Sequence, residues 1–187
     1  MMTHQMKKID FPVSNVRHFL EPGPVVLVSS QHDGETDIMT LGWHTVLEFS
    51  PSLIGCMISA GNHSNQLIRQ SGECVINLPT SSLLETVVKI GNCSGTRCDK
   101  FHDFALTAEK GERVSAPLIA ECHASFECTL HNDQLVDGFS FFIFEVIKAH
   151  VAASPEKPET IHYCGDGEFM LSGKHVSRRS LFRPDML

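Results

Sequence analysis

The stretch Ala120-Glu121-Cys122-His123-Ala124-Ser125-Phe126-Glu127-Cys128-Thr129-Leu130 alternates small or apolar residues with polar ones along its whole length. Side chains of a β-strand point alternately to its two faces, so this period of two predicts a strand with one buried face. The other face is expected to be exposed to water. Its residues are Glu121, His123, Ser125, Glu127 and Thr129.

Other stretches of the chain also read as strands, because they are short, rich in β-branched or apolar residues, and bounded by proline, glycine or aspartate. They are residues 25–30, 37–45, 53–59, 74–79 and 139–151. An Asp-Gly pair between the first two predicts a hairpin. The last is apolar on both faces, which a long barrel strand or a dimer interface would explain.

Short helices are predicted over residues 63–70, 81–90 and 99–104. Ser64 is the expected N-cap of the first, and the spacing of Ser82 and Glu85 predicts a capping box in the second. Many short strands with few helices indicate a mainly β (α+β) fold, an antiparallel barrel with helices plugging its ends. Without a repeat or linker, residues 1–187 are expected to form this single domain.

The charge balance excludes some classes of partner. The chain has a net charge of -7 and an isoelectric point near 5.8, so neither nucleic acid nor an anionic membrane is expected as its main partner. No apolar run has the length of a membrane span or signal peptide. We interpret the basic residues between Lys174 and Arg183 as a solvated tail.

The seven cysteines are an odd number without a Cys-x-x-Cys pair, and are interpreted as reduced thiols in a cytoplasmic protein. Cys122, His123, Cys128 and His131 are of the residue types that bind zinc. The strand prediction places His123 on the face opposite to the two cysteines, whereas zinc ligands must converge. No metal is therefore expected.

The first candidate binding segment runs from a predicted strand into the helix at 63–70. A glycine before a helix lets the backbone approach a ligand, and free N–H groups at a helix start favour an anion such as phosphate. The same features occur in capped helices that bind nothing. The candidate residues are Ser59, Ala60, Gly61, His63 and Ser64.

Two further segments carry candidate residues. Trp43 follows Gly42 in a predicted strand and offers a flat surface to a ring, although a core or interface role is the ordinary one for tryptophan. The polar loop 92–101 carries Arg97 and Lys100, which can supply positive charge to a phosphate or to a reduced flavin. Cys98 lies between these cations, which can lower the pKa of a thiol and make it a nucleophile, but the sequence indicates no histidine partner for it.

The order of these pieces resembles the flavin reductase-like family that includes flavoredoxin. The resemblance covers residues 23 to 167 and rests on Gly23 to Val28, Ile38 to Trp43, His63 to Ile68, Cys74 to Pro79, Ser94-Gly95 and Asp99 to Phe101. Tyr163 to Phe169 resembles the family's carboxyl-terminal pattern, a strand that closes the site. Thr96 and Cys164 depart from the family's usual residues.

The resemblance implies an FMN-binding split β-barrel that forms a homodimer. It would transfer hydride from NADH or NADPH, as transient substrates, to FMN and on to a small-molecule or protein acceptor, without a catalytic side chain. The implied cofactor-binding residues are Met39, Thr40, Leu41, Gly42, Trp43, Ser59, Ala60, Gly61, His63, Ser64, Asn77, Ser94, Lys100 and Phe101. An FMN electron carrier without NAD(P)H oxidation, or a barrel for haem or another planar ligand, are the alternatives.

Overall fold

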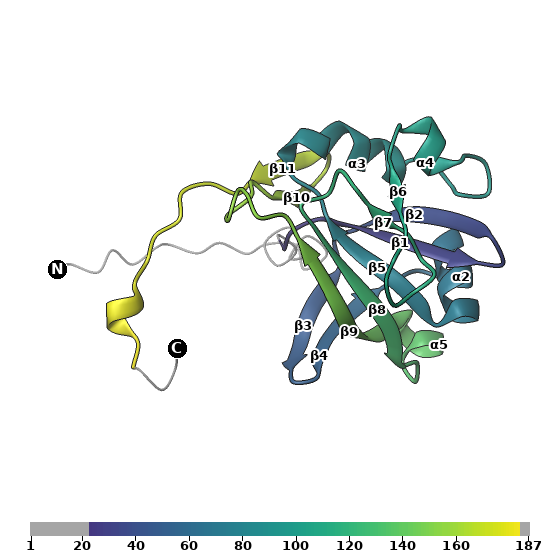
Figure 1. Cartoon of the computed structure of the whole chain (residues 1–187), viewed down its shortest axis with the longest axis horizontal. Coiled ribbons are helices and arrows are strands. Elements are labelled where there is room, and N and C mark those ends of the chain that lie inside the picture. The colour runs from purple at the N-terminus through teal and green to yellow at the C-terminus, as the bar shows by residue number, and fades with distance from the viewer. Residues whose placement is uncertain (1–22, 184–187) are drawn as a thin grey trace, which may run out of the picture.

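The computed structural model describes residues 23–183, and its centre is one seven-stranded antiparallel sheet (Figure 1). The strand order in the sheet is β2-β1-β5-β8-β9-β4-β3. Their bounds are β1 Val26–His32, β2 Glu35–Leu41, β3 His44–Phe49, β4 Ser52–Met57, β5 Glu73–Leu78, β8 Ala124–Asn132 and β9 Phe141–Val151.

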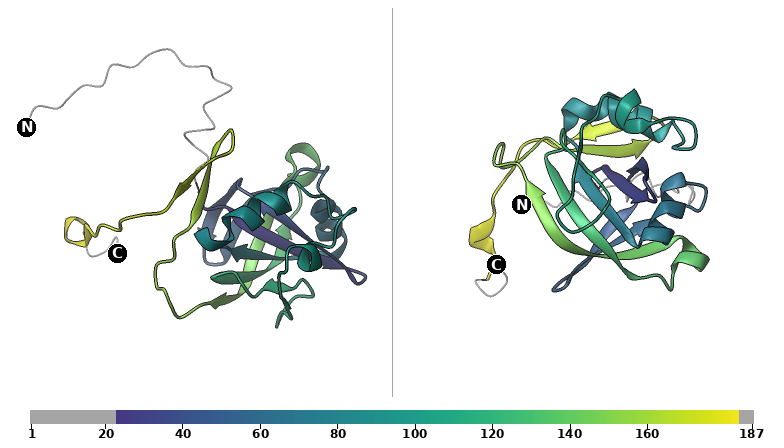
Figure 2. Two further views of the ribbon diagram at one scale, coloured as in Figure 1. Left: turned by 90° about the horizontal axis from the view of Figure 1, so that it is seen from above. Right: turned by 45° about the vertical axis from the view of Figure 1, so that its right-hand side comes forward.

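The sheet curls into a barrel that is open along one seam. Strands β2 and β3 lie at opposite edges of the sheet, yet only Gly42 and Trp43 separate them in sequence. Two residues cannot cross a flat sheet of seven strands, so the edges must come close together at this point. Figure 2 shows the resulting curvature.

Helices and small hairpins cover the barrel (Figure 1). Helix α3, helix α4 and the β10–β11 hairpin gather at one end, and α5 lies at the other. The elements are α2 His63–Ser71, η2 Ser81–Leu83, α3 Leu84–Gly91, α4 Lys100–Asp103, β6 Ala108–Glu109, β7 Leu118–Ile119, α5 Val136–Phe139, β10 Ile161–Gly165, β11 Glu168–Leu171 and η3 Arg179–Leu181. None of the helices in residues 23–183 is long and apolar enough to cross a membrane.

The predicted strands are confirmed, with four corrections. The predicted strand 37–45 is broken at Gly42, where the chain passes from β2 to β3. The alternating stretch becomes a strand only at Ala124, after a turn. Residue 139 belongs to α5, and the segment at 163–169 is a hairpin of two strands, β10 and β11, where one strand was expected.

The helices lie where they were predicted, but two of the proposed caps are wrong. The N-cap of α2 is Asn62, because the Ser64 hydroxyl points inward and donates to Asp37 at 2.6 Å. The Ser82–Glu85 capping box does not form, since the chain makes the 3₁₀ turn η2 first and α3 begins only at Leu84. Asp99 caps α4 by accepting from the His102 N–H.

The face of β8 that was predicted to be exposed is buried at its centre. Ser125 and Glu127 are 5% and 0% exposed. The chain segment before β7 covers them: the Glu127 carboxylate accepts the N–H groups of Glu112, Arg113 and Val114 at 2.7–3.1 Å and lies 2.6 Å from His150 Nε2. The alternation of apolar and polar residues therefore predicts the strand correctly. It could not show that a loop distant in sequence covers the polar face of that strand.

Glu127→Gln is expected to destabilise the protein at neutral pH and to remove part of its acid sensitivity. Burial by itself would raise the Glu127 pKa, but the His150 contact and the backbone N–H donors together lower it from 4.5 to about 2. The carboxylate therefore contributes stability that is fully present above about pH 4.5 and is lost as the pH falls toward 2. The expected loss at pH 7 is about 2–3 kcal/mol.

Urea unfolding at pH 7 and at acid pH measures this loss. Glu156→Gln, on an exposed residue, is the matched control and should change little. An equal loss for Glu127→Gln at all pH values would contradict the assignment of the acid dependence to this carboxylate.

The expectation that all cysteines are free thiols is wrong for one pair. Cys93 and Cys98 form a disulfide, whereas Cys56, Cys74, Cys122, Cys128 and Cys164 are free. Reduced thiols, on which the expectation of a cytoplasmic protein rests, are therefore found at Cys56, Cys74, Cys122, Cys128 and Cys164 but not at the bridged pair.

Candidate functional site

Two adjoining hollows lie beside the last turn of α3 and share its end residues Gly91 and Asn92. The first is an apolar hollow of about 460 Å³, lined by Val25, Thr40, Val87, Val88, Gly91, Asn92, Tyr163, Gly167 and Phe169. The second is a polar hollow of about 240 Å³, lined by Asp37, Gly61, Asn62, His63, Gly91, Asn92, Cys93, Ser94, Gly95, Arg97 and Lys100. The two hollows therefore adjoin at the end of α3.

The N-terminus of α2 forms one side of the polar hollow. Gly61, Asn62 and His63 line it. The N–H groups of His63 and Ser64 belong to the first turn, where no intrahelical acceptor exists, and the described residues provide them with no other acceptor. Such groups, together with the helix dipole, favour an anion.

A buried ion pair forms the floor of the polar hollow. Lys100 Nζ lies 2.9 Å from Asp37 Oδ1, and the two side chains are only 4% and 2% exposed. Lys100 also donates to the Ile38 carbonyl, and Ser64 donates to Asp37 Oδ2 at 2.6 Å. The charge of Lys100 is therefore balanced by Asp37, which the sequence alone did not reveal.

Arg97 supplies the polar hollow with a cation that no described acidic residue balances. Its side chain is exposed and lines the hollow, and no ion pair joins it to another residue within 23–183. A planar guanidinium with several N–H donors suits a phosphate. Among the described residues it is thus the best-placed partner for an anion there.

The apolar hollow has an aromatic wall. Tyr163 and Phe169, from the two strands of the β10–β11 hairpin, pack with ring centroids 5.1 Å apart. Val87 of α3 lines another side, and the Thr40 hydroxyl donates to its carbonyl at 2.7 Å, which fixes α3 on β2. A rigid, mostly apolar wall of this kind suits a flat ring system.

The structure brings five of the predicted cofactor-binding residues to the hollows. These are Thr40 in the apolar hollow and Gly61, His63, Ser94 and Lys100 in the polar one. Ser64 lies directly behind them through its bond to Asp37. For these residues a role in binding remains a prediction, now with a geometry that fits it.

The other predicted residues line neither hollow. Met39 and Leu41 are buried in the barrel core, Phe101 packs in the core beneath α3, and Ser59 and Ala60 are exposed before α2. Gly42 and Trp43 lie at the seam, where Trp43 is 48% exposed. Arg97 is a cation of the predicted polar loop but lies outside the predicted set of binding residues. Tyr163 and Phe169 belong to the segment that the family resemblance predicts to close the site, whereas no sequence signal points to Val87.

Asn77 has a structural position that the sequence reasoning did not foresee. It is fully buried, and its side-chain nitrogen donates to the Leu27 carbonyl and to Ser29 Oγ at 3.2 and 3.0 Å. Its oxygen accepts from the Ile119 N–H at 3.1 Å and from Ser125 Oγ at 2.7 Å. The side chain thereby connects β1, β7 and β8 to its own strand β5.

Comparison with known proteins places this geometry in a family. The flavin reductase like domain matches residues 17–169. The chain belongs to the flavin reductase-like family. This family member is 32% identical over 135 residues to an uncharacterized protein of Archaeoglobus fulgidus, covering 72% of this chain and 76% of that one. It is 26% identical to the uncharacterized protein YddH of Escherichia coli, covering 90% and 97% of the two chains.

Solved structures show the same fold for this flavin reductase-like chain. The flavoredoxin of Methanosarcina acetivorans has a TM-score of 0.81 at 23% identity, with 95% of this chain and 100% of that chain covered. An FMN-binding domain of a flavin reductases-like enzyme from Shewanella baltica has a TM-score of 0.75 at 24% identity, covering 89% and 95%. The predicted fold, a mainly antiparallel split barrel with a few short helices, is confirmed.

Proposed function

We propose that this flavin reductase-like protein binds FMN across the two hollows and passes hydride from NADH or NADPH through it to an acceptor. The single observation that carries the proposal is that the polar hollow, with Arg97 and the start of α2, adjoins the aromatic-walled hollow at Gly91 and Asn92. A flavin mononucleotide has the same two ends, a phosphate and a flat ring system.

The residues present fit the two ends of FMN. The polar hollow offers Arg97, the N–H groups at the start of α2 and the Ser94 hydroxyl to a single phosphate. The apolar hollow offers Tyr163, Phe169 and Val87 to the ring. FMN is favoured over FAD because the sequence contains no second phosphate-binding loop of the Gly-x-Gly-x-x-Gly kind.

The chain itself needs only to position and shield the reacting groups. When bound, FMN supplies a ring that accepts hydride directly, and such a transfer requires no protein acid or base. Thr40 holds α3 against β2, so the walls of the apolar hollow keep their spacing. The packed rings of Tyr163 and Phe169 line the apolar hollow and would shield a bound ring from water on that side.

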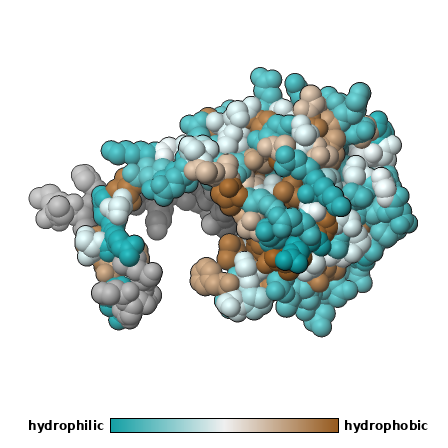
Figure 3. All heavy atoms as spheres, in the orientation of Figure 1, coloured by the Kyte–Doolittle hydropathy of each residue, from teal (hydrophilic) through white to brown (hydrophobic). Residues whose placement is uncertain are grey.

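A homodimer is the proposed assembly. The edge strand β3 exposes Val46 and Phe49, at 64% and 88%, and β9 exposes Ile147 and Val151, at 40% and 62%. Figure 3 shows apolar side chains gathered on the side of the barrel nearest the C-terminal segment. Exposed apolar side chains gathered on one side of a domain favour a protein interface there. Light scattering of the purified protein is expected to give twice the monomer mass, and the monomer mass would contradict the dimer.

Anaerobic mixing of the FMN-loaded protein with NADH, and separately with NADPH, tests the proposed activity. One or both should bleach the visible absorbance of the bound flavin, and the colour should return when a ferric complex is added as acceptor. A protein that binds FMN but is reduced by neither nucleotide would be an electron carrier, and the enzyme proposal would be wrong. A purified protein that holds another planar ligand and no flavin would exclude both the flavin enzyme and the flavin electron carrier.

A further inference from the structure

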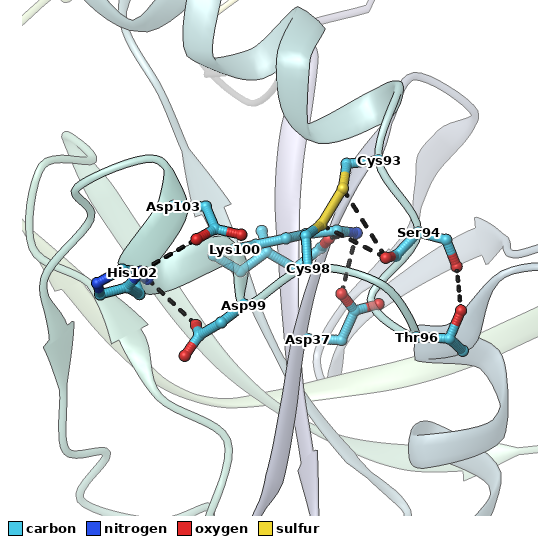
Figure 4. The surroundings of a disulfide bond; sticks show 10 residues. Asp37, Cys93, Ser94, Thr96, Cys98, Asp99, Lys100, His102 and Asp103 are labelled. Carbon is cyan, nitrogen blue, oxygen red and sulfur yellow. Dashed lines mark hydrogen bonds and ion pairs between the residues drawn. A yellow bond between two sulfur atoms is a disulfide. The ribbon is translucent and has the colours of Figure 1, made fainter.

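A disulfide closes the loop between α3 and α4. Cys93 follows the end of α3, and Cys98 precedes Asp99, the N-cap of α4. The two cysteines are five positions apart, so the bridge ties both ends of a very short loop together. Figure 4 shows this bridge above the Asp37–Lys100 pair, with Ser94 and Thr96 beside it.

The bridged loop packs against Asp37 and His63, which line the polar hollow. Gly95 packs so tightly against Asp37 and His63 that an added Cβ would collide with both side chains. Within the loop, the Arg97 N–H donates to the Ser94 carbonyl at 2.9 Å, and the Ser94 and Thr96 hydroxyls lie 3.0 Å apart. Because Ser94, Gly95 and Arg97 line the hollow, its shape depends on this loop being closed.

The bridge is also accessible, in contrast to most of the free thiols. Cys93 lines the polar hollow, and both bridged cysteines are only half-buried. Cys56, Cys74 and Cys128 are buried in the barrel core. Burial raises the pKa of the Cys56 and Cys74 thiols above their ordinary value and raises the pKa of Cys122 to about 12, so these thiols ionise poorly at neutral pH.

We propose that the Cys93–Cys98 pair is a site of reversible thiol–disulfide exchange with dithiols, and that its reduction weakens the binding of a phosphate group in the polar hollow. The second half of this statement rests on the proposed function. With the bridge intact the loop is already ordered before the phosphate group binds. The reduced loop must lose conformational entropy when the phosphate group binds, and this cost lowers the affinity.

The exchange balances as a two-electron reaction. A dithiol attacks the Cys93 sulfur as its thiolate, the sulfur–sulfur bond breaks, and Cys98 leaves as a thiolate that takes up a proton. The second thiol of the reagent then displaces Cys93, so that the protein gains two thiols and the dithiol becomes a disulfide. Cys98 Sγ lies 3.4 Å from the Ser94 carbonyl oxygen, to which the new thiol can donate.

The test compares the oxidised protein, the protein reduced with dithiothreitol and kept anaerobic, and the double variant Cys93→Ser/Cys98→Ser. The affinity for FMN is measured by quenching of FMN fluorescence. We expect the reduced protein and the double variant to bind FMN about tenfold more weakly than the oxidised protein. Dithiothreitol should not change the FMN affinity of the double variant. Cys122→Ser, which alters a free cysteine away from the hollow, is the matched control and should respond like the wild type.

A second readout needs no flavin. Trypsin cuts after arginine, so the rate of cleavage at Arg97 reports how often the loop opens. Mass spectrometry after alkylation counts the free thiols in each state. Cleavage should be faster after reduction and equally fast in the double variant. If neither the oxidised nor the reduced protein binds FMN, the proposed function is wrong. The cleavage rates would still show whether Cys93 and Cys98 are a site of thiol–disulfide exchange that controls the loop. Unchanged cleavage, or FMN affinity that is equal in both redox states, would overturn the proposal.

Discussion

Lys100→Ala is expected to lower the free energy of unfolding by about 3–5 kcal/mol at neutral pH, the usual cost of removing one partner of a buried ion pair. The Asp37 carboxylate would stay buried, with the Ser64 hydroxyl still donating to it but without its cation. The same carboxylate lines the polar hollow and would then repel a phosphate. Urea unfolding measures the first effect, and FMN titration of the folded variant measures the second.

Two further variants make this result specific. Lys89→Ala removes an exposed lysine whose ion pair with Glu85 spans 3.9 Å, and should cost no more than about 0.5 kcal/mol. Asp37→Asn combined with Lys100→Met removes both charges and should recover most of the lost stability. A loss below about 1 kcal/mol for Lys100→Ala would show that the pair is not a buried element of the fold.

Asn77→Ala is expected to lower the free energy of unfolding by about 3–5 kcal/mol, because several buried groups lose their partner at once. The Ile119 N–H and the Ser125 hydroxyl would lose their acceptor, and Ser29 Oγ would lose a donor. Asn77 lines neither hollow, so the variant that remains folded should bind FMN within about threefold of the wild type. Thermal unfolding and FMN titration separate these two effects.

Gln66→Ala, on an exposed position of α2, is the matched amide variant and should leave the stability within about 0.5 kcal/mol of the wild type. The assignment of Asn77 to the core would be wrong if Asn77→Ala unfolded like the wild type and lost FMN affinity. That outcome would instead support the direct flavin contact expected from the family resemblance.

The strands could be predicted from the sequence because their signal is local. Alternation in residues 124–130 and the apolar run at 25–30 depend only on neighbouring residues, and both correspond to strands. The break at Gly42 could not be predicted in this way. It arises because β2 and β3 must lie at opposite edges of a curled sheet, which is a property of the whole barrel.

The site was predicted less completely, because its parts meet only in three dimensions. The segment at 61–64 and Lys100 were found through the chemistry of helix starts and cations, and they do converge on one hollow. The pairing of Lys100 with Asp37 joins positions far apart in sequence, and no spacing rule connects them. Likewise, Tyr163 and Phe169 reach α3 only because the hairpin packs on that end of the barrel.

Titration of the flavin-free protein with FMN and with riboflavin, which lacks the phosphate, tests the central claim most directly. If the polar hollow holds the phosphate, FMN should bind at least about 100-fold more tightly than riboflavin, since charge-assisted hydrogen bonds contribute about 1.5–3 kcal/mol each. Arg97→Gln should reduce that preference about tenfold and leave riboflavin binding unchanged. Failure to bind FMN at all, or equal affinity for FMN and riboflavin, would contradict the account.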